Sequence, residues 1–172
     1  NDPSKLLKLA ETSKINIFGT SAKYIDALSK TKVKPKEFFD LKTVRTLCST
    51  GSPLSPEGYD FIKDNIKPDL QIASISGGTD LLSCFVLSNP FDPIVRGEIQ
   101  CRGLGMDVDI FDDKGNSLID QEGELVCKKP FPSMPIKFWN DPENKNYKSA
   151  YFNIFEGAWR HGDWAKITER GT

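Results

Sequence analysis

The stretch VRTLCSTGSPLSPEGYDFIKDNIKPDLQIASI, residues 44–75, decides the fold. Val44–Cys48 alternates and is rich in residues that favour β structure, so it predicts a strand. Ser55 followed by Pro56 predicts a helix start, because serine caps helix N-termini and proline suits the first turn. The helix should run to about residue 65, and Leu70–Ile75 predicts a second strand. Strand, helix and strand at this spacing form a βαβ unit, which implies a parallel sheet.

The residues before this stretch continue the alternation of strand and helix signals. Ile15–Phe18 is apolar and predicts a further strand. Thr20 or Ser21 can cap a helix through Lys23–Leu28. Pro35 is expected in the loop that leads to the next strand. The first half of the chain is therefore predicted to be an α/β layer.

The residues after Pro90 have a different sequence pattern. A hairpin turn is predicted at Asp112–Asn116, between short alternating segments. Short strands with turns every few residues are typical of a small antiparallel sheet or barrel. We place the boundary near Asn89, so the chain is predicted to divide into residues 1–89 and residues 90–172. The predicted strands of the second part are Gly97–Cys101, Met106–Phe111, Gly123–Cys127 and Trp164–Thr168.

The composition excludes several classes of function. The 172 residues carry a formal charge of -1, so no basic field favours nucleic acid or an anionic membrane as a partner. Apolar runs are too short to span a bilayer. The single His161 cannot build a histidine metal site. Widely spaced cysteines without a C-x-x-C pair indicate free thiols in a reducing cytoplasm, where we expect the protein to act: Cys48, Cys84, Cys101 and Cys127.

Two loops that follow predicted strands carry groups suited to a phosphate ligand. In Ser74–Asp80 the adjacent Gly77 and Gly78 allow backbone N–H groups to face an anion. Thr79 adds a hydroxyl, and Asp80 adds a carboxylate of the kind that Mg²⁺ takes together with phosphate oxygens. A plain turn remains an alternative for this segment. The second loop, residues 49–54, would lie at the same edge of a parallel sheet, where open α/β sheets bind ligands.

A third segment with potential chemistry is Trp159–Trp164. It holds Asp163 between a glycine and a tryptophan at the start of a predicted strand. A carboxylate at such a place can accept two hydrogen bonds from a ribose diol. An ordinary turn aspartate explains the residue equally well, so the chemistry alone leaves both interpretations open.

Taken together, these motifs resemble the adenylate-forming superfamily. The resemblance rests on a Gly-Ser-Pro loop at residues 51–53, a Gly-Gly-Thr-Asp loop at residues 77–80, and a Gly-Glu-Leu-Val strand followed by His-Gly-Asp at residues 161–163. It extends from about Phe18 to Thr172. Longer stretches resemble the acetoacetyl-CoA synthetase subfamily: Ile75–Asp80, Arg96–Cys101, Leu104–Met106, Gly123–Pro135 and Phe138–Asp141.

The resemblance implies an acid–thiol ligase that works on small molecules. Such an enzyme makes an acyl-adenylate from ATP and acetoacetate with Mg²⁺, and then transfers the acyl group to coenzyme A. Residues 1–89 would be the nucleotide- and acyl-binding part of a large α/β domain, and residues 90–172 a barrel-like subdomain. Two alternatives remain: a synthetase for another short- or medium-chain acid, and a non-catalytic nucleotide-binding module.

The resemblance also implies roles for individual residues. The adenine would lie on Gly51, Ser52 and Pro53, and the nucleotide would be bordered by Ser76, Gly77 and Gly78. Thr79 would bond a phosphate and Asp80 would hold Mg²⁺, in the place where most members of the superfamily carry glutamate. Asp163 would hold the ribose hydroxyls. The acyl pocket would be bordered by Phe18, Gly19, Thr50 and Gly77, where Gly77 takes the place of a tryptophan that closes the pocket in acetate-activating relatives.

Two parts that the resemblance requires are not found in these residues. By the resemblance, a Ser/Thr/Gly-rich phosphate loop is expected before Phe18 and a small lysine-bearing domain after Thr172, and neither is among these 172 residues. Preorganised cations stabilise the charge that develops in adenylyl transfer, and the lysine would be one of them. We therefore expect an internal fragment of a longer enzyme that is inactive by itself.

Overall fold

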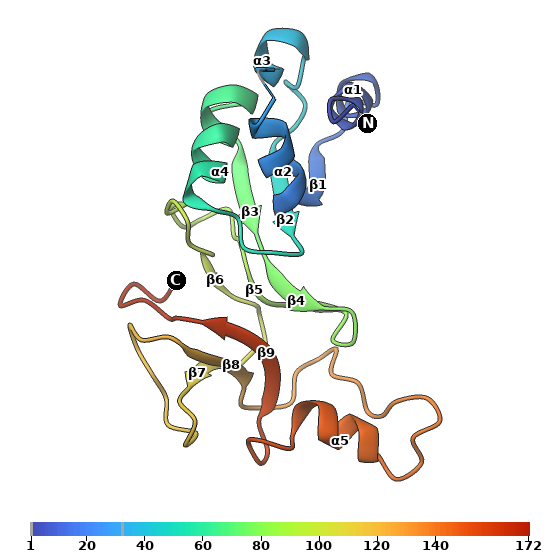
Figure 1. The fold of residues 1–172 in the computed structure, drawn as a ribbon, viewed down its shortest axis with the longest axis vertical. Helices are drawn as coiled ribbons and strands as arrows, with labels where there is room; N and C mark the ends of the chain where they lie inside the picture. The colour runs from blue at the N-terminus through green and yellow to red at the C-terminus, as the bar shows by residue number, and fades with distance from the viewer. Residues whose placement is uncertain (1, 32) are drawn as a thin grey trace. The chain divides into compact units, whose positions relative to one another are not determined.

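The computed structural model describes residues 2–31 and 33–172, and it divides into two compact units (Figure 1). The first unit contains the residues up to Ser76 together with Leu87–Gln100, and the second contains Gly77–Val86 together with Cys101–Thr172. The units are therefore interleaved along the chain. The boundary near Asn89 stays a prediction for the domains of the protein. No helix in the described part of the chain has the length and hydropathy needed to cross a membrane.

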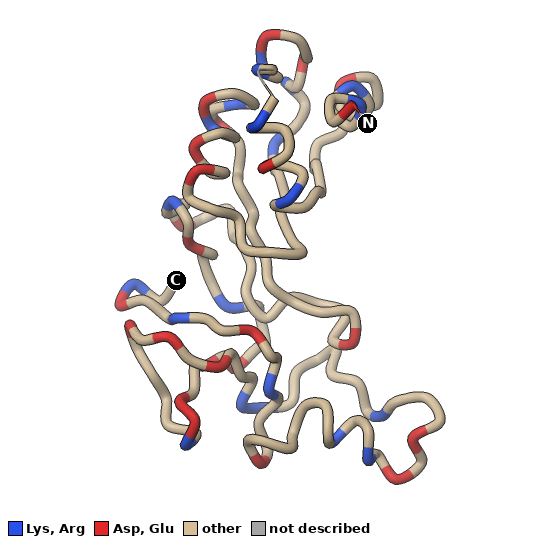
Figure 2. Tube along the Cα trace, viewed as in Figure 1, with Lys and Arg blue, Asp and Glu red and all other residues tan. Residues whose placement is uncertain are grey.

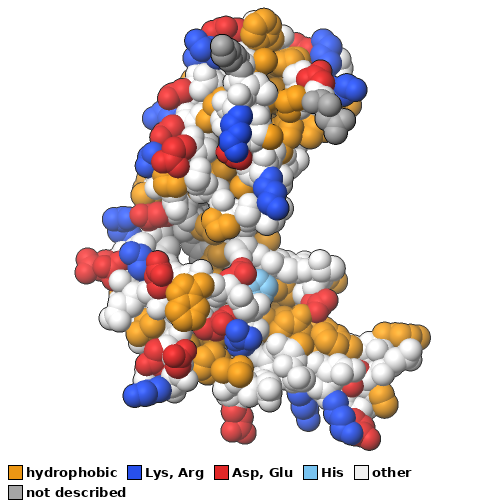
Figure 3. Space-filling model, viewed as in Figure 1, with side chains coloured by type: hydrophobic (Ala, Val, Ile, Leu, Met, Phe, Trp, Pro, Cys, Tyr) orange, Lys and Arg blue, Asp and Glu red, His pale blue; other side chains and the backbone are white. Residues whose placement is uncertain are grey.

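Charged residues of both signs are spread along both units (Figure 2). Hydrophobic side chains reach the surface between them (Figure 3). The most exposed large ones stand on loops and turns, at 84–97% exposure: Leu82, Phe91, Leu104, Ile136 and Trp139. Apolar atoms are common on protein surfaces, so single exposed side chains of this kind carry no functional argument by themselves.

The first unit is built on a parallel three-stranded sheet in the order β1-β2-β3. The strands are β1 (Ile17–Ser21), β2 (Thr46–Thr50) and β3 (Gln71–Ser74). Leu47 in β2 lies between Phe18 on one side and Ile72 on the other. The parallel pairing of β2 with β3 confirms the sheet that the βαβ pattern predicts.

Helices make the crossovers that parallel strands need. The Ser21 hydroxyl accepts the N–H of Tyr24 at 3.2 Å, and the Ser55 hydroxyl accepts the N–H of Gly58 at 3.1 Å, which confirms both predicted caps. Pro35, expected in a loop, instead begins a short helix. The helical segments are α1 (Lys5–Thr12), α2 (Ala22–Ser29), α3 (Pro35–Phe38) and α4 (Pro56–Phe61), which continues as the π-helical segment Ile62–Ile66.

An apolar core lies between these helices and the sheet. Leu7, Ile25, Leu28, Leu47 and Ile62 have no exposed surface. Burying one such side chain contributes about 1.5–3 kcal/mol, so this core is the main source of stability for the unit.

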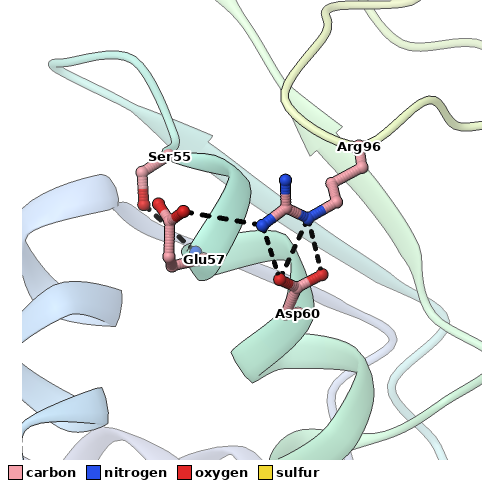
Figure 4. A network of polar contacts seen from close by, with 5 residues as sticks. Ser55, Glu57, Asp60 and Arg96 are labelled. Carbon is pink, nitrogen blue, oxygen red and sulfur yellow. Dashed lines mark hydrogen bonds and ion pairs between the residues drawn. The ribbon is translucent and has the colours of Figure 1, made fainter.

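The segment Leu87–Gln100 is attached to α4 through side chains (Figure 4). The Arg96 guanidinium donates to both oxygens of Asp60 at 2.8–2.9 Å and lies 3.5 Å from Glu57. The Tyr59 hydroxyl donates to the carbonyl oxygen of Glu98 at 2.8 Å. These contacts hold a segment without regular structure, and the predicted strand at Gly97–Cys101 is largely wrong.

The second unit contains short strands in two sheets of three strands each. Two end residues of one of these sheets, Ser76 and Leu87, are assigned to the first unit. Among the described residues these sheets form no closed barrel, so the predicted barrel-like subdomain is not supported. Residues 76–78, predicted as a loop, form a strand. One sheet has the order β4 (Ser76–Gly78), β5 (Ser83–Leu87), β6 (Cys101–Arg102), and the other has the order β7 (Val108–Phe111), β8 (Gly123–Cys127), β9 (Trp159–Ala165).

The second sheet is antiparallel, and its last strand contains a bulge. Asp112 accepts the N–H groups of Lys114 and Asn116, each at 2.8 Å, so the predicted hairpin turn is confirmed. In the pairing of β8 with β9, Val126 lies opposite Arg160 but Glu124 lies opposite Trp164. The three residues 161–163 of β9 therefore lie opposite the single residue Leu125 of β8. Such bulges bend a strand and redirect its side chains.

Helix α5 (Lys145–Tyr151), which no sequence signal predicts, packs on β9. Its Tyr147 and Tyr151 enter an aromatic cluster around the buried Trp159. Phe85 and Phe131 approach the same indole edge-on, with ring centroids 6.2 Å and 5.5 Å away. Edge-to-face pairs of this kind contribute about 0.5–1.5 kcal/mol beyond the area they bury, so the cluster fixes α5 firmly.

Candidate functional site

The predicted adenine loop follows β2 at the carboxyl edge of the parallel sheet. Thr50 is the last residue of β2 and lies opposite Ser21, the last residue of β1. Gly51 then turns the chain with a φ of 82°, a left-handed conformation that favours glycine. Ser52 and Pro53 follow it towards the cap of α4. The predicted loop at residues 49–54 therefore begins two residues later than expected, because Ser49 and Thr50 still belong to β2. The contacts of these residues with a ligand stay a prediction.

Phe18 and Gly19 lie inside β1, which extends three residues beyond the predicted strand end at Phe18. The Phe18 side chain is 6% exposed and packs edge-on against Tyr24, with ring centroids 6.2 Å apart. Gly19 pairs with Cys48 and has open space on its side-chain face. Phe18 thus has a clear structural role in the core, and the acyl-pocket role of both residues stays a prediction.

A cavity of about 230 Å³ in the second unit contains part of the predicted phosphate site. Thr79 and Asp80 lie in the turn between β4 and β5, which closes with a hydrogen bond from the N–H of Leu82 to the Thr79 carbonyl at 3.2 Å. Both side chains are exposed towards solvent. Residues from α5 and β9 complete the lining, which consists of Gly78, Thr79, Asp80, Leu81, Tyr151, Trp159 and His161.

Asp80 is held by a residue that the sequence did not point to. The Tyr151 hydroxyl donates a hydrogen bond to Oδ2 of Asp80. Burial and the neighbouring Asp80 carboxylate raise the pKa of Tyr151 to about 12, so the phenol stays protonated and remains a donor at neutral pH. Among the described residues, this hydrogen bond from Tyr151 engages Oδ2 of Asp80, so that Oδ1 can bind a ligand.

The residues at this cavity fit a magnesium ion only if a ligand supplies further oxygens. No group of three or more His, Cys, Asp or Glu side chains in the described ranges could hold a metal ion. Asp80 and Thr79 offer one carboxylate and one hydroxyl. Mg²⁺ in nucleotide sites needs only one or two carboxylates, because water and phosphate oxygens complete its octahedron. The donor set therefore suits a cation that arrives with a phosphate ligand.

The two glycines of the motif lie close to neighbouring atoms, and Gly77 is required for steric reasons. A Cβ on Gly77 would lie 2.2 Å from the Ser83 carbonyl oxygen and 2.7 Å from Cys84 Cα, so β5 leaves no space for a side chain. The φ of Gly77 is not positive, so the left-handed conformation that favours glycine elsewhere is not the reason for glycine at this position. A Cβ on Gly78 would lie 3.3 Å from Cε1 of His161. The motif is therefore packed tightly against its neighbours.

The bulge in β9 presents His161 and Asp163. Gly162 has a φ of 90° and donates its N–H to Oε1 of Glu124 at 2.6 Å. His161 lies edge-on to Phe85, and its Nε2 is 3.6 Å from Oδ2 of Asp163. The Asp163 carboxylate remains 54% exposed. Asp163 is thus accessible on the strand that also contributes His161 to the cavity, and its contact with a ribose stays a prediction.

Sequence reasoning missed Tyr151 and Glu124. Tyr151 lies in α5, whose N-cap Asn144 is left-handed and makes no side-chain cap, so no local signal announces the helix. The sequence predicts Glu124 only as part of the strand Gly123–Cys127. Its burial at 7% exposure is unusual for a carboxylate and could not be predicted from spacing. His161 belongs to the sequence motif Trp159–Trp164, but its position beside Gly78 follows only from the tertiary structure.

The chain is similar over almost its whole length to proteins of one kind. An acetoacetyl-coenzyme A synthetase of Rhizobium meliloti (strain 1021) is 52% identical over 170 residues, which are 99% of this chain and 26% of the relative. An acetoacetyl-CoA synthetase of Gallus gallus is 44% identical over 168 residues, which are 98% of this chain and 25% of the relative. The chain thus spans about a quarter of the length of these relatives. No protein-family model matches it.

Solved structures agree in fold. The structure of an acetoacetyl-CoA synthetase from Streptomyces lividans matches with a TM-score of 0.90 and 44% identity, over 98% of this chain and 27% of that one. The anthranilate CoA ligase AuaEII in complex with anthranoyl-AMP matches with a TM-score of 0.80 and 18% identity, over 98% of this chain and 30% of that one. At that identity the second match shows the fold alone.

Proposed function

Because this chain belongs, over its whole length, to the acetoacetyl-CoA synthetase family, we propose that it is the nucleotide- and acyl-binding stretch of an AMP-forming acid–thiol ligase. The observation that carries the proposal is the 52% identity over 170 residues, which includes the segment that lines the cavity. The proposed substrates of the whole enzyme are ATP, acetoacetate and coenzyme A. The four free cysteines accord with a cytoplasmic reaction.

The proposed reaction has two steps. A carboxylate oxygen of the acid attacks the α-phosphorus of ATP, an oxygen–phosphorus bond forms, and pyrophosphate leaves. The thiol of coenzyme A then attacks the acyl carbon, and AMP leaves with the bonding electrons of the carbon–oxygen bond. Mg²⁺, when bound, would neutralise charge on the phosphates.

The residues of this chain bind and orient the nucleotide in this proposal. Thr79 donates a hydroxyl to a phosphate, and Asp80 supplies the open carboxylate oxygen to the cation. Asp163 accepts the two ribose hydroxyls. The adenine rests on the loop of Gly51, Ser52 and Pro53, with Ser76 and Gly78 along the nucleotide, while the acid is bordered by Phe18, Gly19, Thr50 and Gly77.

The proposal is tested in the full-length protein that carries these residues. Exchange of labelled pyrophosphate into ATP should depend on Mg²⁺ and on acetoacetate, more strongly than on acetate or butyrate at equal concentration. Asp80→Asn keeps the shape of the side chain and removes its charge, so exchange should fall strongly and recover in part at high Mg²⁺. The proposal is overturned if pyrophosphate exchange depends on none of these acids. If exchange is clearly faster with another acid than with acetoacetate, that acid is the substrate instead.

A further inference from the structure

We propose that Tyr151 is a positioning residue that orients the Asp80 carboxylate for a divalent cation bound with the nucleotide. The inference rests on the proposed function, in which Asp80 is the metal ligand. It concerns a residue on α5 that lies 71 positions away from its partner in the sequence.

The Tyr151 ring is fixed from two directions. It stacks on the indole of Trp159, with ring centroids 3.5 Å apart and planes inclined by 14°. Trp159 is 1% exposed and is itself packed by Phe85 and Phe131. Tyr147, one turn earlier on α5, touches both Trp159 and Tyr151. The hydroxyl therefore projects from a rigid aromatic platform, while its partner Asp80 stands on an exposed turn.

This arrangement fixes the carboxylate without neutralising it. An exposed aspartate on a turn would otherwise lose side-chain freedom when it binds a cation, and that loss opposes binding. The phenol occupies Oδ2 and leaves Oδ1 open, so the rotamer is selected before the cation arrives. Hydrogen-bond partners that orient metal ligands typically contribute about 10–100-fold to metal affinity. We expect an effect at the lower end for Tyr151, about tenfold, because phosphates supply most of the other ligands.

The same helix offers a matched control. The Tyr147 hydroxyl is buried and has no hydrogen-bond partner among the described residues. Tyr147→Phe and Tyr151→Phe each remove one hydroxyl from the same aromatic cluster and keep the ring contacts. The two substitutions differ in that only Tyr151→Phe removes a bond to Asp80.

The test measures cation binding directly in the full-length protein, with Mn²⁺ as the probe and a nonhydrolysable ATP analogue, by electron paramagnetic resonance of free Mn²⁺. Tyr151→Phe should weaken Mn²⁺ binding about tenfold, and Tyr147→Phe should leave it unchanged. Asp80→Asn should weaken binding at least as much, and adding Tyr151→Phe to Asp80→Asn should cause no further loss.

The outcomes separate the two hypotheses. Unchanged Mn²⁺ binding in Asp80→Asn would overturn the metal-binding role of Asp80 and, with it, the role of Tyr151. Weakened binding in Asp80→Asn together with normal binding in Tyr151→Phe would overturn the inference alone. A drop in melting temperature for Tyr151→Phe without a change in Mn²⁺ binding would show that the hydroxyl serves only stability, which also overturns it.

Discussion

The Glu124 carboxylate spans the bulge of β9: its Oε1 accepts the N–H of Gly162 at 2.6 Å, and its Oε2 accepts Nε–H of Arg160 at 2.9 Å. Residues in a bulge lose their partners in the strand ladder. The side chain of Glu124 replaces the missing ladder partner for Gly162, and its charge is compensated by Arg160. The bulge that presents His161 and Asp163 is therefore held by a side chain of the adjacent strand.

The first prediction concerns the stability of the bulge. Glu124→Ala should lower the free energy of unfolding by about 1.5–3 kcal/mol, because it removes hydrogen bonds to a charged group and leaves the Gly162 N–H without its acceptor. Glu124→Gln should cost less, since the amide oxygen can still accept one bond. Urea denaturation measures both. Glu122→Ala, at an exposed position two residues earlier, is the control and should have little effect. Equal stability of Glu124→Ala and Glu122→Ala would contradict the role of Glu124.

The second prediction concerns Asp163. If its carboxylate holds both ribose hydroxyls, the charge-assisted hydrogen bonds contribute roughly 1.5–3 kcal/mol. Asp163→Ala in the full-length protein should then raise the apparent KM for ATP about tenfold or more and leave the KM for the acid nearly unchanged. Asp113→Ala, an exposed aspartate in the hairpin turn, is the matched control. Normal use of ATP by Asp163→Ala would show that the residue has another role.

The third prediction concerns Gly77, where the structure separates two explanations. If its only role were to leave the acyl pocket open, Gly77→Trp would block acetoacetate and spare acetate. The approach of Ser83 and Cys84 predicts instead that any side chain disturbs the pairing of β4 with β5. We therefore expect Gly77→Ala, which adds a single methyl group, to reduce activity with acetate and acetoacetate alike and to lower the melting temperature.

Steady-state rates with both acids test this expectation. Gly19→Ala is the control for the melting temperature alone, because a Cβ at Gly19 would meet no protein atom within 4 Å. A normal Gly77→Ala enzyme, or a Gly77→Trp enzyme that keeps acetate and loses acetoacetate by tenfold or more, would instead favour the pocket-wall explanation.

The fourth prediction concerns pH. Burial alone would raise the pKa of Asp109, but hydrogen bonds from Lys128 at 2.9 Å, Ser117 at 2.7 Å and the N–H of Ile110 at 2.8 Å hold this pKa below its ordinary value. The unfolded chain then binds the proton more readily than the folded protein does. The stabilisation is present above about pH 4, the ordinary pKa of aspartate, and is lost as the pH falls through the lowered folded pKa.

Urea unfolding at several pH values between 2 and 7 measures this dependence. Asp109→Asn should flatten the acid side of the stability curve, and Asp113→Asn controls for the loss of one negative charge. An unchanged acid slope in Asp109→Asn would contradict the prediction.

The sequence predicts the parallel sheet well because its signals are local. Ser21 and Ser55 cap their helices through neighbouring backbone groups, and each crossover is contiguous in the chain. β4 could not be predicted in this way, since Ser-Gly-Gly has little intrinsic preference for a strand and pairs only because β5 returns beside it. The same reason explains the site. The sequence motif is sufficient to predict Thr79 and Asp80 as site residues. The hydrogen bond from Tyr151 to Asp80, in contrast, forms only after α5 has packed on Trp159.

The interleaving of the two units also has a consequence for synthesis. When the chain has emerged from the ribosome as far as Ser76, all three strands of the parallel sheet are available to pair, yet the first unit still lacks Leu87–Gln100. Tyr59 then has no Glu98 carbonyl to bond, and Asp60 has no Arg96. Strand β5 must emerge before these partners do. A nascent chain that has emerged from the ribosome only as far as residues 77–95 therefore leaves the Tyr59 hydroxyl and the Asp60 carboxylate of α4 in contact with water, and the first unit is completed only when Leu87–Gln100 has followed.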